Sequence, residues 1–263
     1  MQRDVLGSAM RVMEHLSRSR DPVGVREVSR DLGLAVASTH RILRALYRER
    51  LAVQVGERGL YSSGARLAEL AANLGNAEDV VPRAMPLLRA AAAGSGESAL
   101  LMVAQRHESV CLASVESEQF LRVVFPVGWR GPLYRGATGR VLLAYQPPEV
   151  IEAVIARGRR EPAARRLADS AELLRSLARI RRQGHCVSHG ERQEGWTSVA
   201  APVLGPRRVV VAAVSIYGPS PRFERAALQE HTRRVLACAA NIESALHPGI
   251  PYQKGVRHEL EGS

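Results

Sequence analysis

Residues 25–48 read VREVSRDLGLAVASTHRILRALYR, and their pattern decides how the beginning of the chain folds. The first part repeats apolar residues at the spacing of an amphipathic helix and ends at Gly33, which readily takes the left-handed conformation that closes a helix. The second part repeats the pattern after a short turn. The apolar residues expected to face the core are Val25, Val28, Leu32, Ile42, Leu43 and Leu46. The sequence therefore predicts two short helices joined by a tight turn.

The outer face of the second predicted helix is basic. Arg41, Arg44 and Arg48 are three and four residues apart, so they share one stripe, with His40 beside it. An exposed arginine stripe on the second helix of such a pair is what a recognition helix in the DNA major groove requires. The alternative is an ordinary solvated helix face, since runs of charge usually face water.

The elements on both sides of this pair complete a larger motif. A helix over 8–19 precedes it, with Ala9, Val12, Met13 and Leu16 on its apolar face. A strand over 51–55, a turn at 56–59 and a return strand from Leu60 follow it. Together they predict a winged helix-turn-helix, in which Arg58 at the hairpin tip either contacts a DNA phosphate or is merely solvated.

The composition limits the class of protein. A chain of 263 residues, 46% of them hydrophobic, can bury one or two cores. The formal net charge of +11 favours a polyanionic partner. The three cysteines are odd in number and far apart, which is typical of reduced thiols. Because the sequence has neither a signal-peptide pattern nor a run long enough to span a membrane, we expect a soluble, cytoplasmic protein.

From about residue 97 the pattern becomes sheet-like. Strands are expected over about 99–104, 110–114, 121–126, 185–189, 196–203 and 208–217, with helices between and after them. This order favours an α+β fold, in which one antiparallel sheet is covered by helices. The expected organisation is a DNA-binding domain over 1–63, a linker helix over 64–78, a second domain over 79–248 and a disordered tail over 249–263.

Long motifs in both halves carry a resemblance to a known family. They are LGLAVASTHRILRAL (32–46), GPLYRGATGRVLLAYQPPE (131–149), IRRQGHCVSHGERQEGWTSVAAPVL (180–204) and VVVAAVSIYGPSPRF (209–223). With them the chain resembles the IclR family of bacterial transcription regulators from about Ser8 to His247. The resemblance implies a winged helix that dimerises on a near-palindromic DNA operator, and a GAF-like effector-binding domain over 79–248. No catalytic residue, metal or cofactor is expected. A repressor is expected, with an activator as the alternative.

The start of the recognition helix departs from the family pattern. The family usually has Pro-Lys/Arg-Ser-Thr there, whereas this chain has Ala-Val-Ala-Ser at 35–38. A basic contact is therefore missing, and base reading is expected to shift toward Ser38, Thr39 and Arg41. The complete set expected to contact DNA is Ser38, Thr39, His40, Arg41, Arg44, Arg48 and Arg58.

A small-molecule pocket is expected in the second domain. Matched by position to the family, it includes Gly136, Ala137, Ser188, Trp196, Ser198, Ser215 and Tyr217, with Gln119 and Arg122 at its border. The loop before Gly136 precedes a helix, so its N–H groups suit an anion. Ser215 and Tyr217 are two apart on one strand and therefore face the same way. The effector is expected to be a small organic acid, whose carboxylate Arg122 could pair with. The alternative is a half-polar sheet face exposed to water.

Other chemistry has little support. His185, Cys186 and His189 resemble a fragment of a metal site, but strand alternation would point the cysteine away from the histidines. Glu191 and Glu194 form no recognisable catalytic carboxylate pair. Two rival functions remain: an enzyme with a DNA-binding anchor, and a DNA-binding protein whose pocket is empty and which is regulated by a partner protein.

Two apolar stripes predict self-association. One consists of Leu67, Leu70, Ala71 and Leu74 on the linker helix, and the other of Ala9, Val12 and Met13 near the N-terminus. An isolated winged helix has no room to bury both, so we expect them to pack between protomers in a homodimer or homotetramer.

Overall fold

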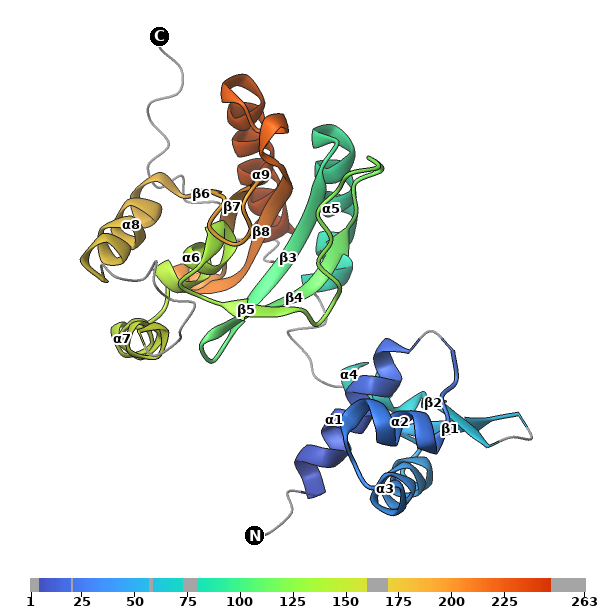
Figure 1. Ribbon diagram of the computed structural model, residues 1–263. Helices are drawn as coiled ribbons and strands as arrows, with labels where there is room; N and C mark the ends of the chain where they lie inside the picture. Colours follow the sequence, from blue (N-terminus) through green and yellow to red (C-terminus); the bar gives the residue numbers. More distant parts are fainter. Residues whose placement is uncertain (1–4, 20, 57–58, 73–79, 160–169, 247–263) are drawn as a thin grey trace. The chain divides into compact units, whose positions relative to one another are not determined.

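The computed structural model describes residues 5–19, 21–56, 59–72, 80–159 and 170–246. It divides the chain into two compact units, residues 1–78 and 79–263 (Figure 1). Arg58, the linker beyond Ala72 and the expected tail over 249–263 lie outside the described residues, as do the side chain of Ala71 and the whole of Leu74.

The first unit is a winged helix-turn-helix, as the sequence predicts. Its elements are α1 (Val5–Arg18), α2 (Val25–Leu32), α3 (Val36–Arg48), β1 (Ala52–Val55), β2 (Leu60–Ser63) and α4 (Arg66–Ala72). Gly33 ends α2 with φ +64°, in the left-handed conformation that favours glycine. The wing pairs Ala52 with Ser63 and Val55 with Leu60 in antiparallel register. Val23, which precedes α2, bridges to Tyr61 of the wing and ties it to the helices.

The core of this unit buries much of the apolar stripe that was expected on α1 to lie between protomers. Val12 and Leu16 are buried against α3 and the wing, so the expectation that Val12 packs between protomers is wrong. Met13 also packs partly against this core. The exposed apolar residues of α1 lie on another face of the helix: Val5, Leu6 and Met10.

The second unit contains one antiparallel sheet with helices on both faces. Its strands are β3 (Ser98–Gln105), β4 (Glu108–Val115), β5 (Arg130–Pro132), β6 (Cys186–His189), β7 (Trp196–Leu204) and β8 (Val210–Pro219). They lie in the order β5-β4-β3-β8-β7-β6, and every neighbouring pair is antiparallel. The helices are α5 (Val80–Ser95), α6 (Gly136–Ala144), α7 (Pro148–Gly158), α8 (Ser170–Gln183) and α9 (Arg225–Leu246). This confirms the predicted α+β class.

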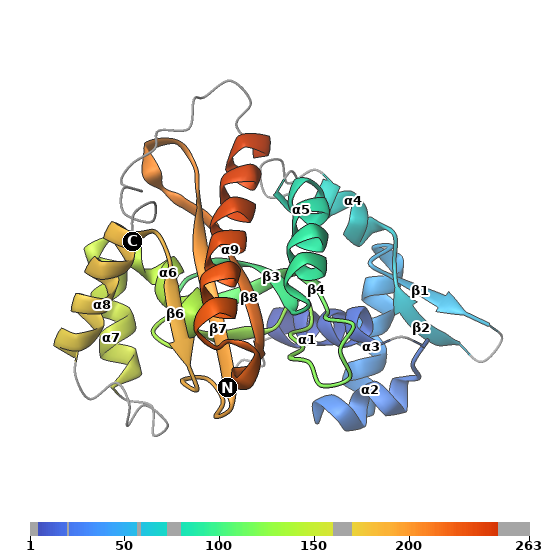
Figure 2. The same cartoon turned by 90° about the horizontal axis from the view of Figure 1, so that it is seen from above.

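The two faces of the sheet build two separate cores. On one face α5 and α9 lie side by side against β3, β7 and β8, over residues such as Leu101, Val214 and Ile216 (Figure 2). On the other face α6 packs against β7 and β8, with α8 packed against α6, over Leu100 and Ala213. The expected pocket residues belong to this second face.

One predicted strand is absent. Residues 121–126 form no strand, although Val123 and Phe125 are buried as a strand pattern would suggest. The neighbouring strand β4 instead pairs with residues farther along the chain. Cys111 N–H donates to the Trp129 carbonyl at 2.9 Å, and Gly128 N–H donates to the Cys111 carbonyl at 2.8 Å. The segment at Val123 is held by a side chain, because Ser98 Oγ donates to its carbonyl at 2.7 Å.

None of the described helices is both long enough and apolar enough to cross a membrane.

Candidate functional site

Helix α3 presents a free basic face. Its inner residues Ile42, Leu43 and Leu46 are buried, whereas Arg41, Arg44 and Arg48 are exposed. None of these three arginines makes a hydrogen bond or an ion pair with a described residue. A guanidinium that has no partner inside the protein keeps all its donors for a ligand, and the planar fork of donors suits a guanine edge or a phosphate.

The start of α3 corrects one expectation. Thr39 is fully buried, and its hydroxyl donates to the Ala35 carbonyl at 3.2 Å, so it is not available to read a base. Ser38 is half-buried, and His40 is exposed. The exposed residues that the sequence reasoning missed are apolar: Val36 at the start of α3 and Tyr47 near its end. Apolar side chains in a major groove contact thymine methyl groups.

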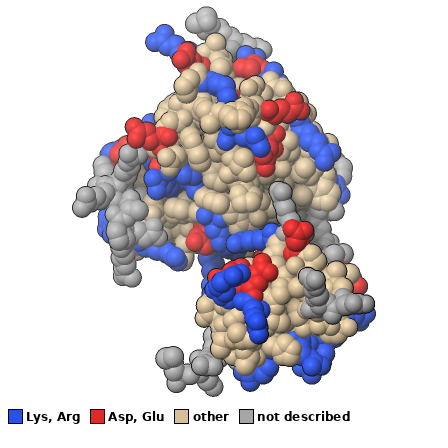
Figure 3. All heavy atoms as spheres, turned by 45° about the vertical axis from the view of Figure 1, so that its right-hand side comes forward, with Lys and Arg blue, Asp and Glu red and all other residues tan. Residues whose placement is uncertain are grey.

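The positive charge is not confined to α3. In the view of Figure 3, basic side chains are spread over both units with acidic ones among them. The net charge of +11 therefore favours a polyanion without locating its site, and α3 is singled out by the spacing and freedom of its arginines.

The expected pocket residues of the sheet do converge. Ser188 lies opposite Ser198, and Ser198 lies opposite Tyr217, so the three side chains form one row across β6, β7 and β8. Ser215 is two residues before Tyr217 and shares its face. All four are less than 5% exposed, which contradicts the alternative of a polar face open to water. The Ser215 hydroxyl is buried and has no hydrogen-bond partner among the described residues.

The other expected residues meet this row at the start of α6. Gly136 and Ala137 are buried, and Gly136 has φ +78°. The hydroxyls of Thr138 and Tyr217 share a hydrogen bond of 3.1 Å, which joins α6 to the row on the sheet. The Gly136 N–H, expected to face an anion, donates to Glu191 Oε2 at 3.2 Å. A carboxylate of the chain itself therefore occupies the predicted anion position.

The segment between β6 and β7 brings this carboxylate to α6. Glu191 Oε1 pairs with Arg140 Nη1 at 2.9 Å, and the Glu191 carbonyl accepts from Arg135 Nε. Arg192 Nη2 donates to the Arg135 carbonyl at 3.1 Å. Arg135 and Arg140 belong to the motif around α6. Glu191 and Arg192 belong to a loop much later in the chain, since Glu191 is 55 residues after Gly136.

Arg192 lies in an aromatic environment. Its guanidinium carbon is 4.4 Å from the centroid of the Trp129 ring and 5.9 Å from that of Phe125. The Phe125 centroid is in turn 5.1 Å from that of Tyr217 and 6.1 Å from that of Trp196. Burial lowers the pKa of the Arg192 guanidinium, and Tyr217 and Glu191 act in the opposite direction. The Nε atom of Arg192 is buried and has no hydrogen-bond partner among the described residues.

Two expected pocket residues do not join this cluster. Gln119 and Arg122 are exposed on the segment that follows β4, and Arg122 Nε pairs with Glu116 Oε2 at 2.9 Å. Arg122 therefore already pairs with a carboxylate of the chain, and its expected role toward an effector carboxylate stays a prediction. The fragment of a metal site is also divided. Cys186 is buried on the side of the sheet that α6 covers, and burial raises the pKa of its thiol to about 12. His189 forms a hydrogen bond with Thr197 Oγ1 at 3.1 Å.

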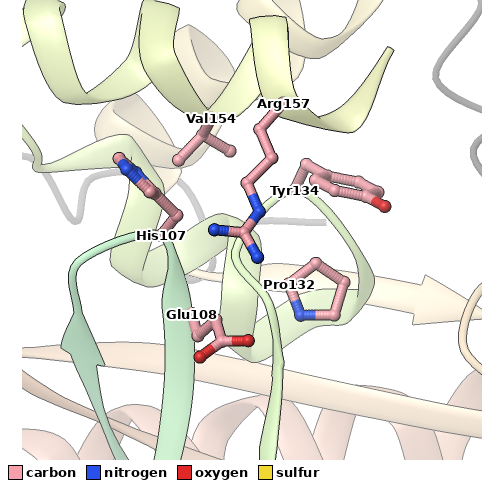
Figure 4. Close-up of a pocket in the computed structure, with 6 residues that line it drawn as sticks. All are labelled: His107, Glu108, Pro132, Tyr134, Val154 and Arg157. Atoms are coloured by element: carbon pink, nitrogen blue, oxygen red, sulfur yellow. The ribbon is translucent and has the colours of Figure 1, made fainter. Parts of the chain in front are cut away.

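A pocket lies elsewhere in the second unit (Figure 4). Arg157 extends from α7 toward Pro132, His107 approaches from the turn between β3 and β4, and Glu108 from the first residue of β4. Tyr134 and Val154 complete its lining. None of the expected effector residues is among these six.

Sequence reasoning missed the charged core of the site. Arg135, Arg140 and Arg192 are not among the residues expected to line the pocket, and Glu191 is expected only to form no catalytic pair with Glu194. The available signal was the segment GERQEG at 190–195, whose glycines bracket charged residues between two strands. Gly190 and Gly195 have φ +62° and +80°, so the segment turns sharply at both ends and returns over the sheet.

Comparison with known proteins covers nearly the whole chain. Residues 5–56 match the model of the IclR helix-turn-helix domain, and residues 73–244 match that of the bacterial transcriptional regulator IclR C-terminal domain. The HTH-type transcriptional repressor AllR of Salmonella typhi is 27% identical over 236 residues, which is 89% of this chain and 87% of the relative. The transcriptional repressor IclR of Escherichia coli K12 is 25% identical over 243 residues, 91% of this chain and 89% of the relative.

Solved structures share the fold. An IclR transcriptional regulator from Alicyclobacillus acidocaldarius has a TM-score of 0.75 and 26% identity, covering 94% of this chain and 100% of that one. An IclR homologue from Microbacterium hydrocarbonoxydans, crystallised in complex with 4-hydroxybenzoate, has a TM-score of 0.76 and 25% identity, covering 92% of this chain and 99% of that one.

Proposed function

The chain belongs to the IclR family of DNA-binding transcriptional regulators, which are not enzymes, and from this premise we propose that it is a repressor controlled by a small organic acid. It binds a near-palindromic operator as a dimer, and the acid binds in the C-terminal unit. The observation that carries the DNA-binding part is the row of exposed arginines on α3 that pair with no described residue: Arg41, Arg44 and Arg48.

The proposed DNA contacts follow from the placement of α3. In a winged helix-turn-helix the second helix of the pair enters the major groove. Arg41 and Arg44 then read base edges, with Ser38 and His40 near the start of the helix. Arg48, at the end of α3, and Arg58, which the sequence predicts at the hairpin tip, contact phosphates, which set position and affinity without reading sequence.

The sign of regulation is proposed from the relatives. The proteins from Salmonella typhi and Escherichia coli described above are both named as repressors. The alternative is an activator that uses the same DNA contacts. A reporter gene behind the operator separates the two, because loss of a repressor raises expression and loss of an activator lowers it.

A dimer is proposed from the surface of α1. Val5 and Leu6 are 69% and 73% exposed, and Met10 lies one turn farther along the helix. Leu70 on α4 is a further exposed apolar side chain of this unit. Such residues are costly to leave in water, and a two-fold dimer that buries them matches a palindromic site.

An acidic effector is proposed from the donors of the site. The buried Ser215 hydroxyl lacks a partner among the described residues, and the Gly136 N–H and the Tyr217 hydroxyl lie on the same face. The homologue from Microbacterium hydrocarbonoxydans was crystallised with 4-hydroxybenzoate, which is an acid. We propose that the effector contacts Gly136, Ala137, Ser188, Trp196, Ser198, Ser215 and Tyr217.

The proposed function is tested in two steps. Selection from a pool of random DNA duplexes should yield a near-palindromic sequence that the purified protein binds in a gel shift. A panel of organic acids should then contain members that raise the melting temperature of the protein, as ligands of the folded state do. Failure to select any duplex would overturn the DNA-binding proposal. The absence of any stabilising acid would favour control by a partner protein, and turnover of a bound acid would favour an enzyme.

A further inference from the structure

The start of α6 gathers more positive charge than the chain neutralises. Arg135, Arg140 and Arg192 surround this helix end, and Glu191 is the one carboxylate with which any of them pairs among the described residues. Arg140 forms an ion pair with the Glu191 side chain, whereas Arg135 and Arg192 donate hydrogen bonds to backbone carbonyls. Partly buried guanidinium groups that lack an anion are unfavourable, because burial removes the water that would solvate them.

Two N–H donors and the Tyr217 hydroxyl lie around the position that a Cβ atom of Gly136 would occupy. A Cβ atom built on that residue would lie 3.4 Å from Arg192 Nε and 3.8 Å from Tyr217 Oη. The Gly136 N–H borders the same position, and its bond to Glu191 Oε2 is 3.2 Å long. The Arg192 Nε–H finds no acceptor in the part of the chain that the structure describes, and a buried donor without an acceptor costs free energy.

The surroundings of this position are aromatic. Arg192 lies over the face of Trp129, and Phe125 links that ring to Tyr217 and Trp196 through edge contacts. A flat ring gains offset or edge-to-face contacts in such a cluster, whereas an aliphatic acid of the same charge gains only burial. The donors at this point suit a carboxylate, and the aromatic side chains beside them favour a planar body, which would need the room that the Glu191 side chain fills.

We propose that Glu191 is an internal carboxylate that occupies the effector's anion position in the ligand-free protein, and that a planar aromatic monocarboxylate binds by displacing it and engaging Arg192. The inference rests on the proposed function, in which the C-terminal unit binds an acid. One ligand oxygen takes the Gly136 N–H that Glu191 vacates, and the other takes the Arg192 Nε–H. Glu191 is able to leave, since it is followed by exposed residues at 193–195 and lies between glycines at 190 and 195.

The test removes the internal competitor and, separately, the new donor. Benzoate binding to the full-length protein is measured by calorimetry and by the fluorescence of Trp129 and Trp196, with benzamide as the uncharged analogue. Glu191→Gln abolishes the charge, and Glu191→Asp keeps the charge but shortens its reach. Glu194→Gln is the matched control, because it removes an exposed carboxylate from the same segment. Arg192→Met removes the donor, and Arg89→Met removes an exposed arginine from the same unit.

Both Glu191 variants should bind benzoate about tenfold more tightly than wild type, which corresponds to about 1.4 kcal/mol. Arg192→Met should bind it at least about tenfold more weakly, and neither control variant should differ from wild type. Benzamide should bind weakly to all of them. Thermal melts identify any variant that does not fold. If Glu191→Gln does not fold, Glu191→Asp tests the role of Glu191. If Arg192→Met does not fold, Arg192→Lys, which lacks Nε, tests the role of the Arg192 donor.

The result also separates this inference from the proposed function. If wild type binds benzoate but all the Glu191 and Arg192 variants bind it like their controls, the inference is overturned while control by an acid stands. If wild type binds only aliphatic acids, the aromatic class is overturned. If it binds no acid at all, the proposed function fails first, and this inference falls with it.

Discussion

Replacing Arg41 and Arg44 by alanine should remove sequence-specific DNA binding and leave the fold intact. Both side chains are exposed and make no hydrogen bond or ion pair with the described residues, so their loss should change the free energy of unfolding by no more than about 0.5 kcal/mol. An arginine that reads a guanine edge contributes about 1–3 kcal/mol of discrimination. Each single variant should therefore bind one half-site about five- to 150-fold more weakly, since 1.4 kcal/mol is tenfold.

In a dimer the loss of binding free energy doubles, because each substitution removes one side chain from each half-site. Fluorescence anisotropy on a selected duplex and on a scrambled duplex, at several salt concentrations, measures both affinity and its salt dependence. Removing a base-reading residue lowers the affinity for the selected duplex alone, whereas removing a phosphate-binding residue also reduces the salt slope by about one per phosphate. Arg18→Ala, an exposed arginine at the end of α1, is the matched control. Wild-type affinity in the Arg41/Arg44 double variant would refute the assignment of α3.

Further substitutions test the core, the titration and the assembly. Glu97 is 2% exposed and pairs with Arg222, so Arg222→Ala should lower the unfolding free energy in urea by about 3 kcal/mol, while Arg233→Ala, from an exposed pair, should change it little. Burial lowers the pKa of His231 below 6.5, so the unfolded chain binds more protons and stability falls as the pH drops from about 7 to 5; His231→Gln should flatten this dependence in thermal melts. Burial raises the pKa of the Cys111 thiol to about 11, and those of Cys186 and Cys238 to about 12; a thiol reagent at pH 8 should modify all three only after unfolding. Leu6→Asp should shift light scattering toward the monomer, and an unchanged dimer would show that α1 is not the interface.

The sequence predicted most reliably what depends on local periodicity. The pairing of α2 with α3, the exposed arginines of α3 and the shared face of Ser215 and Tyr217 follow from residue spacing. The row of Ser188, Ser198 and Tyr217 across three strands was expected from the family resemblance instead. The prediction that Thr39 reads a base was wrong, because its side chain faces the core. There its hydroxyl donates to the carbonyl of Ala35, four residues earlier.

What the sequence did not predict depends on contacts between distant segments. The stretch 121–126 has a strand pattern, yet β4 finds its edge partner at Arg130–Pro132. Glu191 and Arg192 meet the start of α6 only because antiparallel pairing of β6 and β7 returns their loop over the sheet. Spacing along the chain contains no information about such a meeting.

The most direct measurement is a reciprocal titration of one protein with its two ligands. The affinity for the selected duplex is measured with and without saturating acid, and the affinity for the acid is measured with and without the duplex. Acid binding should change duplex affinity by a factor of about 5–150, and the duplex should change acid affinity by that same factor, as linkage requires. Equal duplex affinity with and without an acid that demonstrably binds would contradict control by that acid.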